Sequence, residues 1–181
     1  MKTAVVILAD GFEEIEAVTP IDLLRRAGVK VVVAGLGALS VSGARGVTFG
    51  CDVLLAQVPP GWDALILPGG GPGAKNLAAS ALVKQCIDTT LAGDGWLAAI
   101  CAAPAVVLGN QGYLRGRVFT GYPGSDHDEI GGTYKEDPVV VDGRLVTSRG
   151  VGTAPAFALK LVELLVGADK AAEVARSVLL A

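Results

Sequence analysis

The 181-residue sequence predicts an α/β fold, a doubly wound, mostly parallel sheet with helices on both faces. Short apolar runs rich in β-branched residues, typical of strands buried on both faces, alternate with segments of helical period. No internal repeat or linker divides the chain, so we expect one domain over residues 1–181.

The first half of the chain supplies three buried strands, expected at 3–9, 29–36 and 62–71. A helix is expected over 13–28, because acids open it, Arg25 and Arg26 lie in its last turn and Gly28 follows. Pro20 lies inside this segment and predicts a kink or a restart. Residues 38–55 indicate turns and short edge strands.

The second half continues the alternation. Helices are expected at 75–92, 102–110, 153–167 and 168–180, and strands at 95–100, 117–122 and 138–150. Within the last strand segment, Asp142-Gly143 predicts a hairpin turn.

Composition and charge exclude several classes of protein. Hydrophobic residues make up 51% and charged residues 18%, which is enough for a sizeable core. The net charge of −3 offers no basic excess, so we expect no nucleic-acid partner. The apolar run Ala4–Ala9 is too short for a signal peptide, and we expect a cytoplasmic protein that does not bind membranes. Three cysteines without metal-like spacing predict neither a disulfide framework nor a zinc site.

Chemically distinctive residues follow three of the predicted strands. The stretches are ADGFEEIEAV (9–18), LPGGGPGA (67–74) and AICAAP (99–104). Because sites in open α/β sheets form outside the carboxyl ends of the strands, we expect all three to meet in one crevice.

Cys101 lies between a predicted strand and a predicted helix, with small residues after it. A sharp elbow there would put the sulfur at a helix N-terminus, where its pKa would fall below the free value of about 8.5. The alternative is a small buried hydrophobe, and this segment alone leaves the two readings equally open. Cys86 is expected in the core, and Cys51 is expected to be structural.

Backbone N–H groups of Gly69 and Gly70 are candidates for an oxyanion hole, although a plain turn is the alternative. The segment lacks the ending of a phosphate-binding loop. Of the acids after the first strand, Glu13 and Glu14 are expected to complement the helix dipole. Glu16 lies further in and is the candidate for a buried, protonated acid that shuttles protons.

His127 is the only histidine, and a Cys–His pair would form a conventional nucleophile and base. The polar residues around it indicate a solvated loop instead. Both readings stay open at this point.

Four stretches together resemble the ThiJ/PfpI superfamily, and most closely its branch around the Parkinson-disease-associated deglycase (DJ-one). They are VVILADGFEEIEAVTPIDLLRRAGVKVVVAGL, ALILPGGGPGAKNL, AAICAAPAVVL and LVTSRGVGTAPAFALKLVELLVG. The resemblance covers essentially the whole chain. It implies a flavodoxin-like three-layer sandwich and a homodimer, with no metal or organic cofactor.

The resemblance also implies roles for individual residues. Cys101 would be the reactive cysteine and Glu16 the protonated acid bonded to its sulfur. The amides of Gly70 and Ala102 would face a reacting oxygen or an oxidised sulfur. Further positions match residues that support the site or the dimer interface: Arg45, Arg149 and Asp22.

The chain departs from the family pattern at three places. Members with a proteolytic triad carry histidine directly after the cysteine, where this chain has Ala102. Relatives in the closest branch carry a histidine before a proline on the facing loop, where this chain has Tyr122 before Pro123. Val151 replaces a customary proline. These departures weaken any mechanism that needs an imidazole.

Two functions from different classes are therefore expected. One is a cofactor-independent cysteine enzyme of the stress response, a glyoxalase or deglycase acting on aldehydes or dicarbonyls and converting methylglyoxal to lactate. The other is an oxidative-stress sensor or chaperone-like protein that oxidises the same cysteine. A cysteine peptidase is the third and least favoured hypothesis, because Ala102 stands where proteolytic members carry a histidine.

Overall fold

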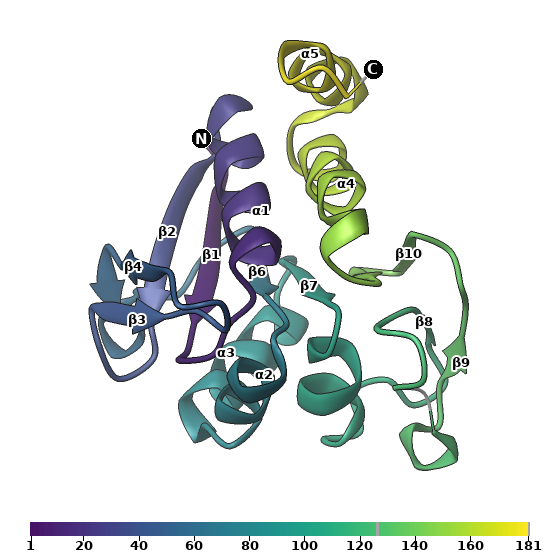
Figure 1. The fold of residues 1–181 in the computed structure, drawn as a ribbon. Helices are drawn as coiled ribbons and strands as arrows, with labels where there is room; N and C mark the ends of the chain where they lie inside the picture. Colours follow the sequence, from purple (N-terminus) through teal and green to yellow (C-terminus); the bar gives the residue numbers. More distant parts are fainter. Residues whose placement is uncertain (126, 181) are drawn as a thin grey trace.

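The computed structural model describes residues 1–125 and 127–180, and a seven-stranded sheet forms its centre (Figure 1). The order across the sheet is β10-β11-β7-β6-β1-β2-β5. The strands are β1 (Thr3–Leu8), β2 (Lys30–Gly35), β5 (Val53–Leu54), β6 (Ala64–Leu67), β7 (Trp96–Ile100), β10 (Val139–Asp142) and β11 (Leu145–Ser148). Every pairing in this sheet is parallel except the β10–β11 hairpin, which turns at the predicted Asp142-Gly143 step.

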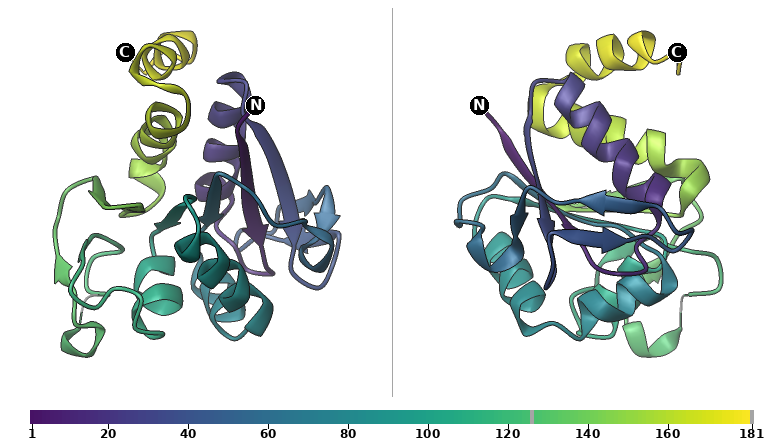
Figure 2. Two further views of the ribbon diagram at one scale, coloured as in Figure 1. Left: turned by 180° about the vertical axis from the view of Figure 1, so that it is seen from behind. Right: turned by 60° about the vertical axis from the view of Figure 1, so that its left-hand side comes forward.

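Helices cover both faces of the sheet and give three layers (Figure 2). One face carries α1 (Glu14–Arg26), α4 (Ala154–Val166) and α5 (Ala168–Ser177). The other carries α2 (Gly71–Ala78), α3 (Ala81–Ala92) and a short π-helix, η2 (Pro104–Gly109). The predicted doubly wound, flavodoxin-like α/β fold is confirmed.

Successive side chains of the central strand β1 pack alternately into two separate hydrophobic cores. Val5 and Ile7 of β1 pack with the α2 and α3 layer, whereas Val6 and Leu8 pack with the α1 and α4 layer. This is the period of two that a strand imposes on its side chains. It explains why residues Ala4–Leu8, which are buried on both faces of the sheet, are all apolar.

Several predicted boundaries need correction. The single helix expected at 75–92 is two helices, because Ser80 caps α3 by accepting a hydrogen bond from the Val83 N–H at 3.3 Å. The helix expected at 102–110 is the shorter π-helix η2. α1 does not restart at Pro20.

Two small sheets lie outside the main one. β3 (Ser40–Ser42) and β4 (Thr48–Gly50) form an antiparallel hairpin within 38–55, where turns and short edge strands were expected. β8 (Val118–Phe119) is much shorter than the strand expected at 117–122 and pairs with β9 (Thr133–Tyr134), a strand that the sequence did not predict. 3₁₀ turns make up η1 (Leu55–Gln57), η3 (Asp128–Ile130) and η4 (Val151–Thr153).

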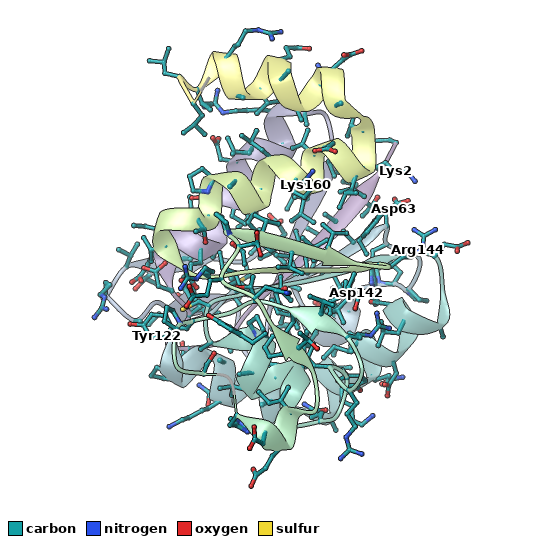
Figure 3. The ribbon with its side chains drawn as sticks, turned by 90° about the vertical axis from the view of Figure 1, so that its right-hand side faces the viewer. Lys2, Asp63, Tyr122, Asp142, Arg144 and Lys160 are labelled. Carbon is teal, nitrogen blue, oxygen red and sulfur yellow. The ribbon has the colours of Figure 1, made fainter. Side chains whose placement is uncertain are left out.

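The parallel strands give the molecule two chemically different ends. Tyr122 lies at the end where these strands finish, and Lys2, Asp63 and Arg144 lie at the opposite end (Figure 3). Within the described residues, no helix is both long enough and apolar enough to span a membrane.

Candidate active site

Cys101 follows β7 directly and adopts a left-handed backbone conformation, with φ of 64°. This region is sterically unfavourable for a residue with a side chain and costs about 1–3 kcal/mol. Neighbouring backbone holds it in place: its N–H donates to the Ser148 carbonyl at 3.0 Å, and its carbonyl accepts from the Tyr122 N–H at 2.8 Å. Cys101 therefore lies on a sharp elbow, not in a regular strand or helix.

Glu16 is fully buried in the first turns of α1. Glu13 caps this helix and accepts a hydrogen bond from the Glu16 N–H at 2.9 Å, which fixes where the helix begins. The Gly69 N–H donates to Glu16 Oε2 at 3.0 Å. The other carboxyl oxygen, Oε1, has no hydrogen-bond partner among the described residues. The carboxyl group lies close enough to the Cys101 sulfur for each group to shift the pKa of the other.

Glycines let the three strand ends approach one another. A Cβ on Gly69 would lie 2.5 Å from Glu16 Oε2 and 2.6 Å from the Cys101 Cβ, so no side chain fits there. Gly70 has φ of 90°, and a Cβ on it would lie 2.3 Å from the Gly11 carbonyl oxygen. The crevice predicted from the three stretches exists and depends on these two glycines.

The backbone N–H groups of Gly70 and Ala102 act on the Cys101 sulfur and favour its ionised form. These are two of the three amides predicted for an oxyanion site. The third, the Gly69 N–H, donates to Glu16 instead. Gly69 thus positions the acid, while Gly70 and Ala102 face the nucleophile.

Burial raises the pKa of Glu16 from 4.5 to about 7. The charge on Glu13 also contributes to this rise, whereas the interaction with the Cys101 thiol and the hydrogen bond from Gly69 act in the opposite direction. An acid with this pKa holds its proton through much of the neutral range. It is suited to proton transfer near pH 7.

While Glu16 is a carboxylate, burial, followed by the charge of Glu16 and the interaction with it, raises the pKa of the Cys101 thiol to about 12. In that ionisation state the predicted lowering of the thiol pKa by a helix N-terminus is wrong, chiefly because the prediction left out the burial of the sulfur. The Gly70 and Ala102 amides act to lower the pKa, as predicted, but do not outweigh the other causes.

The two groups must be treated as a pair because each sets the charge felt by the other. The repulsion that raises the thiol pKa acts only while Glu16 is a carboxylate. When Glu16 keeps its proton, it donates to the sulfur and favours a thiolate. Between the two ionisations, near pH 7 and near pH 12, the pair holds one proton.

A cavity of about 600 Å³ opens over the sulfur. It falls within the usual range for small-molecule sites. Besides Cys101, Glu16, Gly70 and Ala102, it is lined by Glu13, Ala44, Arg45, Gly71, Pro72, Tyr122 and Val151. Two predicted residues, Arg45 and Tyr122, thus border the cavity with exposed side chains.

Glu14 is a residue whose role sequence reasoning underestimated. Its buried carboxylate accepts hydrogen bonds from the N–H groups of Arg45 at 2.7 Å and Val47 at 3.3 Å. Glu14 therefore fixes the β3–β4 turn that places Arg45 at the cavity. The clue in the sequence is Gly43, where a Cβ would collide with the Glu14 side chain.

Thr153 holds the loop on the other side of the sulfur. Its hydroxyl accepts from the N–H groups of Arg149 at 3.2 Å and Gly150 at 3.0 Å, and lies 2.7 Å from Ser148 Oγ. A Cβ on Gly150 would lie 4.0 Å from the Cys101 sulfur. Nothing in the sequence singled out Thr153, because its partners are close in sequence but their position over Cys101 depends on the fold.

Three other candidates lie away from the cavity. Arg149 donates through Nη1 to the Glu136 carbonyl at 3.1 Å. Asp22 is exposed and pairs with Arg26 at 2.7 Å. His127 borders a separate polar hollow with Arg115 and Glu129, so it does not form the Cys–His pair that was one reading of the sequence. Within residues 1–125 and 127–180, no cluster of three or more His, Cys, Asp or Glu could hold a metal ion.

The comparison with known families decides the relationship: the model of the DJ-1/PfpI family matches residues 2–164. This chain belongs to the DJ-1/PfpI family. The protein dj-1beta of Drosophila melanogaster is 45% identical over 99% of this chain and 98% of its own. The glutathione-independent glyoxalase DJR-1.2 of Caenorhabditis elegans is 38% identical over 93% and 91%.

The fold has close counterparts among solved structures of the DJ-1/PfpI family. Oxidized DJ-1 of Toxoplasma gondii superimposes with a TM-score of 0.93 at 38% identity, covering 99% of this chain and 98% of its own. The family and the fold expected from the sequence motifs are both confirmed, and the match to a named glyoxalase supports an enzymatic role within the family.

Proposed function

We propose that this protein is a cofactor-independent glyoxalase that converts small dicarbonyls such as methylglyoxal to hydroxy acids such as lactate. The observation that carries the proposal is the pairing of the elbow cysteine with a buried carboxylic acid whose pKa is near neutrality. The reaction needs one soft nucleophile and one acid that both gives and accepts protons. The glyoxalase name of a relative of similar length is consistent with this.

In the proposed mechanism, Cys101 attacks as a thiolate while Glu16 holds the pair's proton. Sulfur bonds to the aldehyde carbon, and the developing alkoxide is stabilised by the Gly70 and Ala102 N–H groups. Glu16 donates its proton to that oxygen and gives a hemithioacetal.

The Glu16 carboxylate then removes the proton from the former aldehyde carbon, giving an enediolate. Return of that proton to the neighbouring carbon, with transfer of the hydroxyl proton from the first oxygen to the second, gives a thioester of the hydroxy acid. The aldehyde carbon is thereby oxidised and the ketone carbon reduced, so no external oxidant is needed. Water cleaves the thioester, releases lactate and restores the thiolate.

The test is turnover of methylglyoxal to lactate by the wild type, Cys101→Ser and Glu16→Gln, with Glu163→Gln as an exposed control. We expect loss of more than about 1,000-fold for Cys101→Ser and about 100-fold or more for Glu16→Gln. The control should stay within twofold. Negligible turnover of methylglyoxal by the wild type would contradict the proposal.

A second function, an oxidation sensor, is favoured by the amides that face the sulfur. Gly70 and Ala102 could stabilise a sulfinate on Cys101 as well as an alkoxide. A relative of known structure is described as oxidized. A stable mass gain of two oxygens on Cys101 after mild peroxide, in a protein without turnover, would favour the sensor.

A chaperone-like role would share this cysteine. The peptidase reading lacks a base, because His127 does not border the cavity.

We further propose that the chain forms a homodimer through the outer face of α1 and the β3–β4 turn. Ile15, Val18 and Val47 are apolar side chains exposed by 50%, 40% and 55%. Arg45 and Asp22 lie in the same two segments, which agrees with a role in the interface. Sedimentation of the protein at micromolar concentration tests this dimer, and Val18→Glu should give a monomer.

We also propose that the protein is located in the cytoplasm.

A further inference from the structure

A second cavity, of about 550 Å³, lies at the amino end of the sheet, away from Cys101. It forms because β5 pairs with β2 only at Ala34 and Gly35, which leaves the outer edge of β2 uncovered before that point. The chain after η1 then passes beside the gap and supplies Val58, Pro59, Pro60 and Trp62 as a wall.

Several polar backbone groups at this edge are already bonded within the protein. Asp52 accepts from the Val33 N–H at 2.8 Å, and Arg25 donates to the Val31 carbonyl at 3.3 Å. Arg25 and Asp52 also pair with each other at 3.4 Å. A bound molecule would therefore meet few unsatisfied backbone groups here, which favours an apolar body.

Trp62 makes the wall rigid. Its indole N–H donates to Thr90 Oγ1 at 2.8 Å, so the ring is fixed in one orientation without any ligand. A fixed aromatic ring beside two prolines offers a flat apolar surface that loses little conformational entropy on binding.

One end of the cavity is polar. Thr3 and Lys30 are directly paired residues of β1 and β2, so their side chains project from the same face of the sheet. Val5 and Val32, paired in the same way, continue the floor as apolar residues. Among the described residues, the Lys30 ammonium has no ion-pair partner, whereas the nearby Asp63 carboxylate is bonded to Lys2 and to the Thr3 N–H.

From this arrangement we infer a binding site for a small amphipathic carboxylate, with an aromatic or aliphatic body between Trp62 and the valine floor and its carboxylate at Lys30 and Thr3. The lining carries two cations, Arg25 and Lys30, and one acid, Asp52, a net charge of +1 that suits an anion. The volume suits a body of one or two rings. This site is independent of the chemistry proposed for Cys101.

The chain offers a built-in control, because it has only two tryptophans. Trp62 borders the cavity, while Trp96 stacks with Arg144 and does not line it. In a two-dimensional ¹H–¹⁵N spectrum of the full chain, assigned with Trp62→Phe, titration with 1-naphthoate should shift the Trp62 indole signal saturably. The Trp96 signal should move little.

Charge recognition is tested separately from apolar contact. Lys30→Gln should weaken binding of 1-naphthoate by about fivefold or more, Lys30→Arg should retain it, and Lys75→Gln on α2 should leave it unchanged. The neutral 1-naphthylmethanol should bind the wild type as weakly as naphthoate binds Lys30→Gln. No saturable shift at millimolar naphthoate, equal shifts of both indoles, or equal affinity for acid and alcohol would each overturn the inference.

Discussion

The carboxyl end and the amino end of the sheet differ in backbone strain and in the burial of their charged residues. At the carboxyl end, a strained cysteine, a buried acid and two glycines without room for a side chain lie within a few ångströms of one another. At the amino end, backbone groups are satisfied, and charges such as Lys2 and Asp63 pair at the surface. Strain and burial of a titratable group thus occur together at the end where we propose chemistry, as expected for a site that gives up stability for reactivity.

Among changes outside the two reacting residues, the largest effect should come from filling the space at Gly69. Gly69→Ala places a methyl group against both Glu16 and Cys101, so we expect a loss of at least about 2 kcal/mol in unfolding free energy and of more than about 100-fold in turnover. Chemical denaturation and methylglyoxal turnover measure the two. Gly50→Ala in β4 is the control, because a Cβ there meets open space. A Gly69→Ala protein with normal turnover would contradict the close approach of the strand ends.

The Glu16–Cys101 pair should make stability depend on pH in one direction. The pair loses its first proton near pH 7 when folded, whereas a glutamate in the unfolded chain loses its proton near pH 4.5, so the folded state binds that proton more tightly. The resulting stabilisation is fully present below pH 4.5 and is lost as the pH rises through 7, about 3 kcal/mol in all.

Urea unfolding of the wild type and Glu16→Gln at several pH values isolates this contribution. The difference in unfolding free energy between the two should fall as the pH rises from 4 to 8. A difference that is constant with pH would show that folding does not delay the first ionisation of the pair, and would contradict this prediction. Glu163→Gln, on the exposed side of α4, should show no such trend.

A smaller effect is expected at the loop that Thr153 holds. Thr153→Val removes the acceptor of two N–H groups and should cost about 1–3 kcal/mol of stability, with a fall in kcat larger than any rise in KM. Thr153→Ser, which keeps the hydroxyl, should restore both. If Thr153→Val keeps the wild-type kcat, the loop does not position the cysteine.

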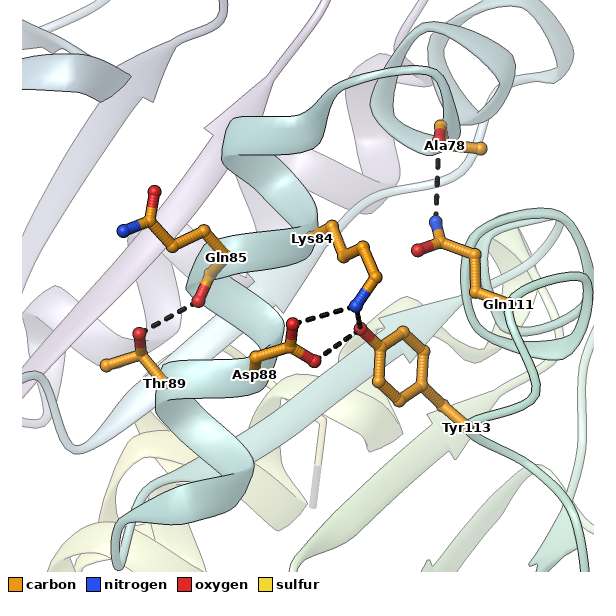
Figure 4. Close-up of polar contacts among 7 residues, drawn as sticks. All are labelled: Ala78, Lys84, Gln85, Asp88, Thr89, Gln111 and Tyr113. Atoms are coloured by element: carbon orange, nitrogen blue, oxygen red, sulfur yellow. Dashed lines mark hydrogen bonds and ion pairs between the residues drawn. The ribbon is translucent and has the colours of Figure 1, made fainter.

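The smallest effect is expected for surface polar contacts far from both cavities. Tyr113 donates to Asp88 at 2.6 Å and accepts from Lys84 at 3.1 Å, in a solvent-exposed cluster on α3 (Figure 4). Tyr113→Phe should change the melting temperature by no more than about 2 °C and leave turnover unaltered. A large loss would mean that exposed pairs matter here as much as buried ones.

The same contrast explains how far sequence reasoning could go. Strands such as β1 can be predicted from an uninterrupted apolar run, here Ala4–Leu8, and motifs identify Cys101, Glu16 and Gly70. The rise in the Cys101 pKa while Glu16 is ionised could not be predicted, because it depends chiefly on how deeply the fold buries the sulfur. Glu14 and Thr153 were missed for the same reason: ordinary residue types acquire their roles from partners that only the fold supplies.

The central claim is that Glu16 and Cys101 hold one proton between them near neutral pH and that Glu16 keeps it. Thiolate absorbance of Cys101 against pH, with Cys51→Ser and Cys86→Ser in the background, tests this most directly. The account predicts thiolate appearing with the first ionisation near pH 7, and a shift of less than about one unit in Glu16→Gln. A thiol that stays protonated above pH 10 in the wild type, but ionises well below that in Glu16→Gln, would place the proton on sulfur and contradict the account.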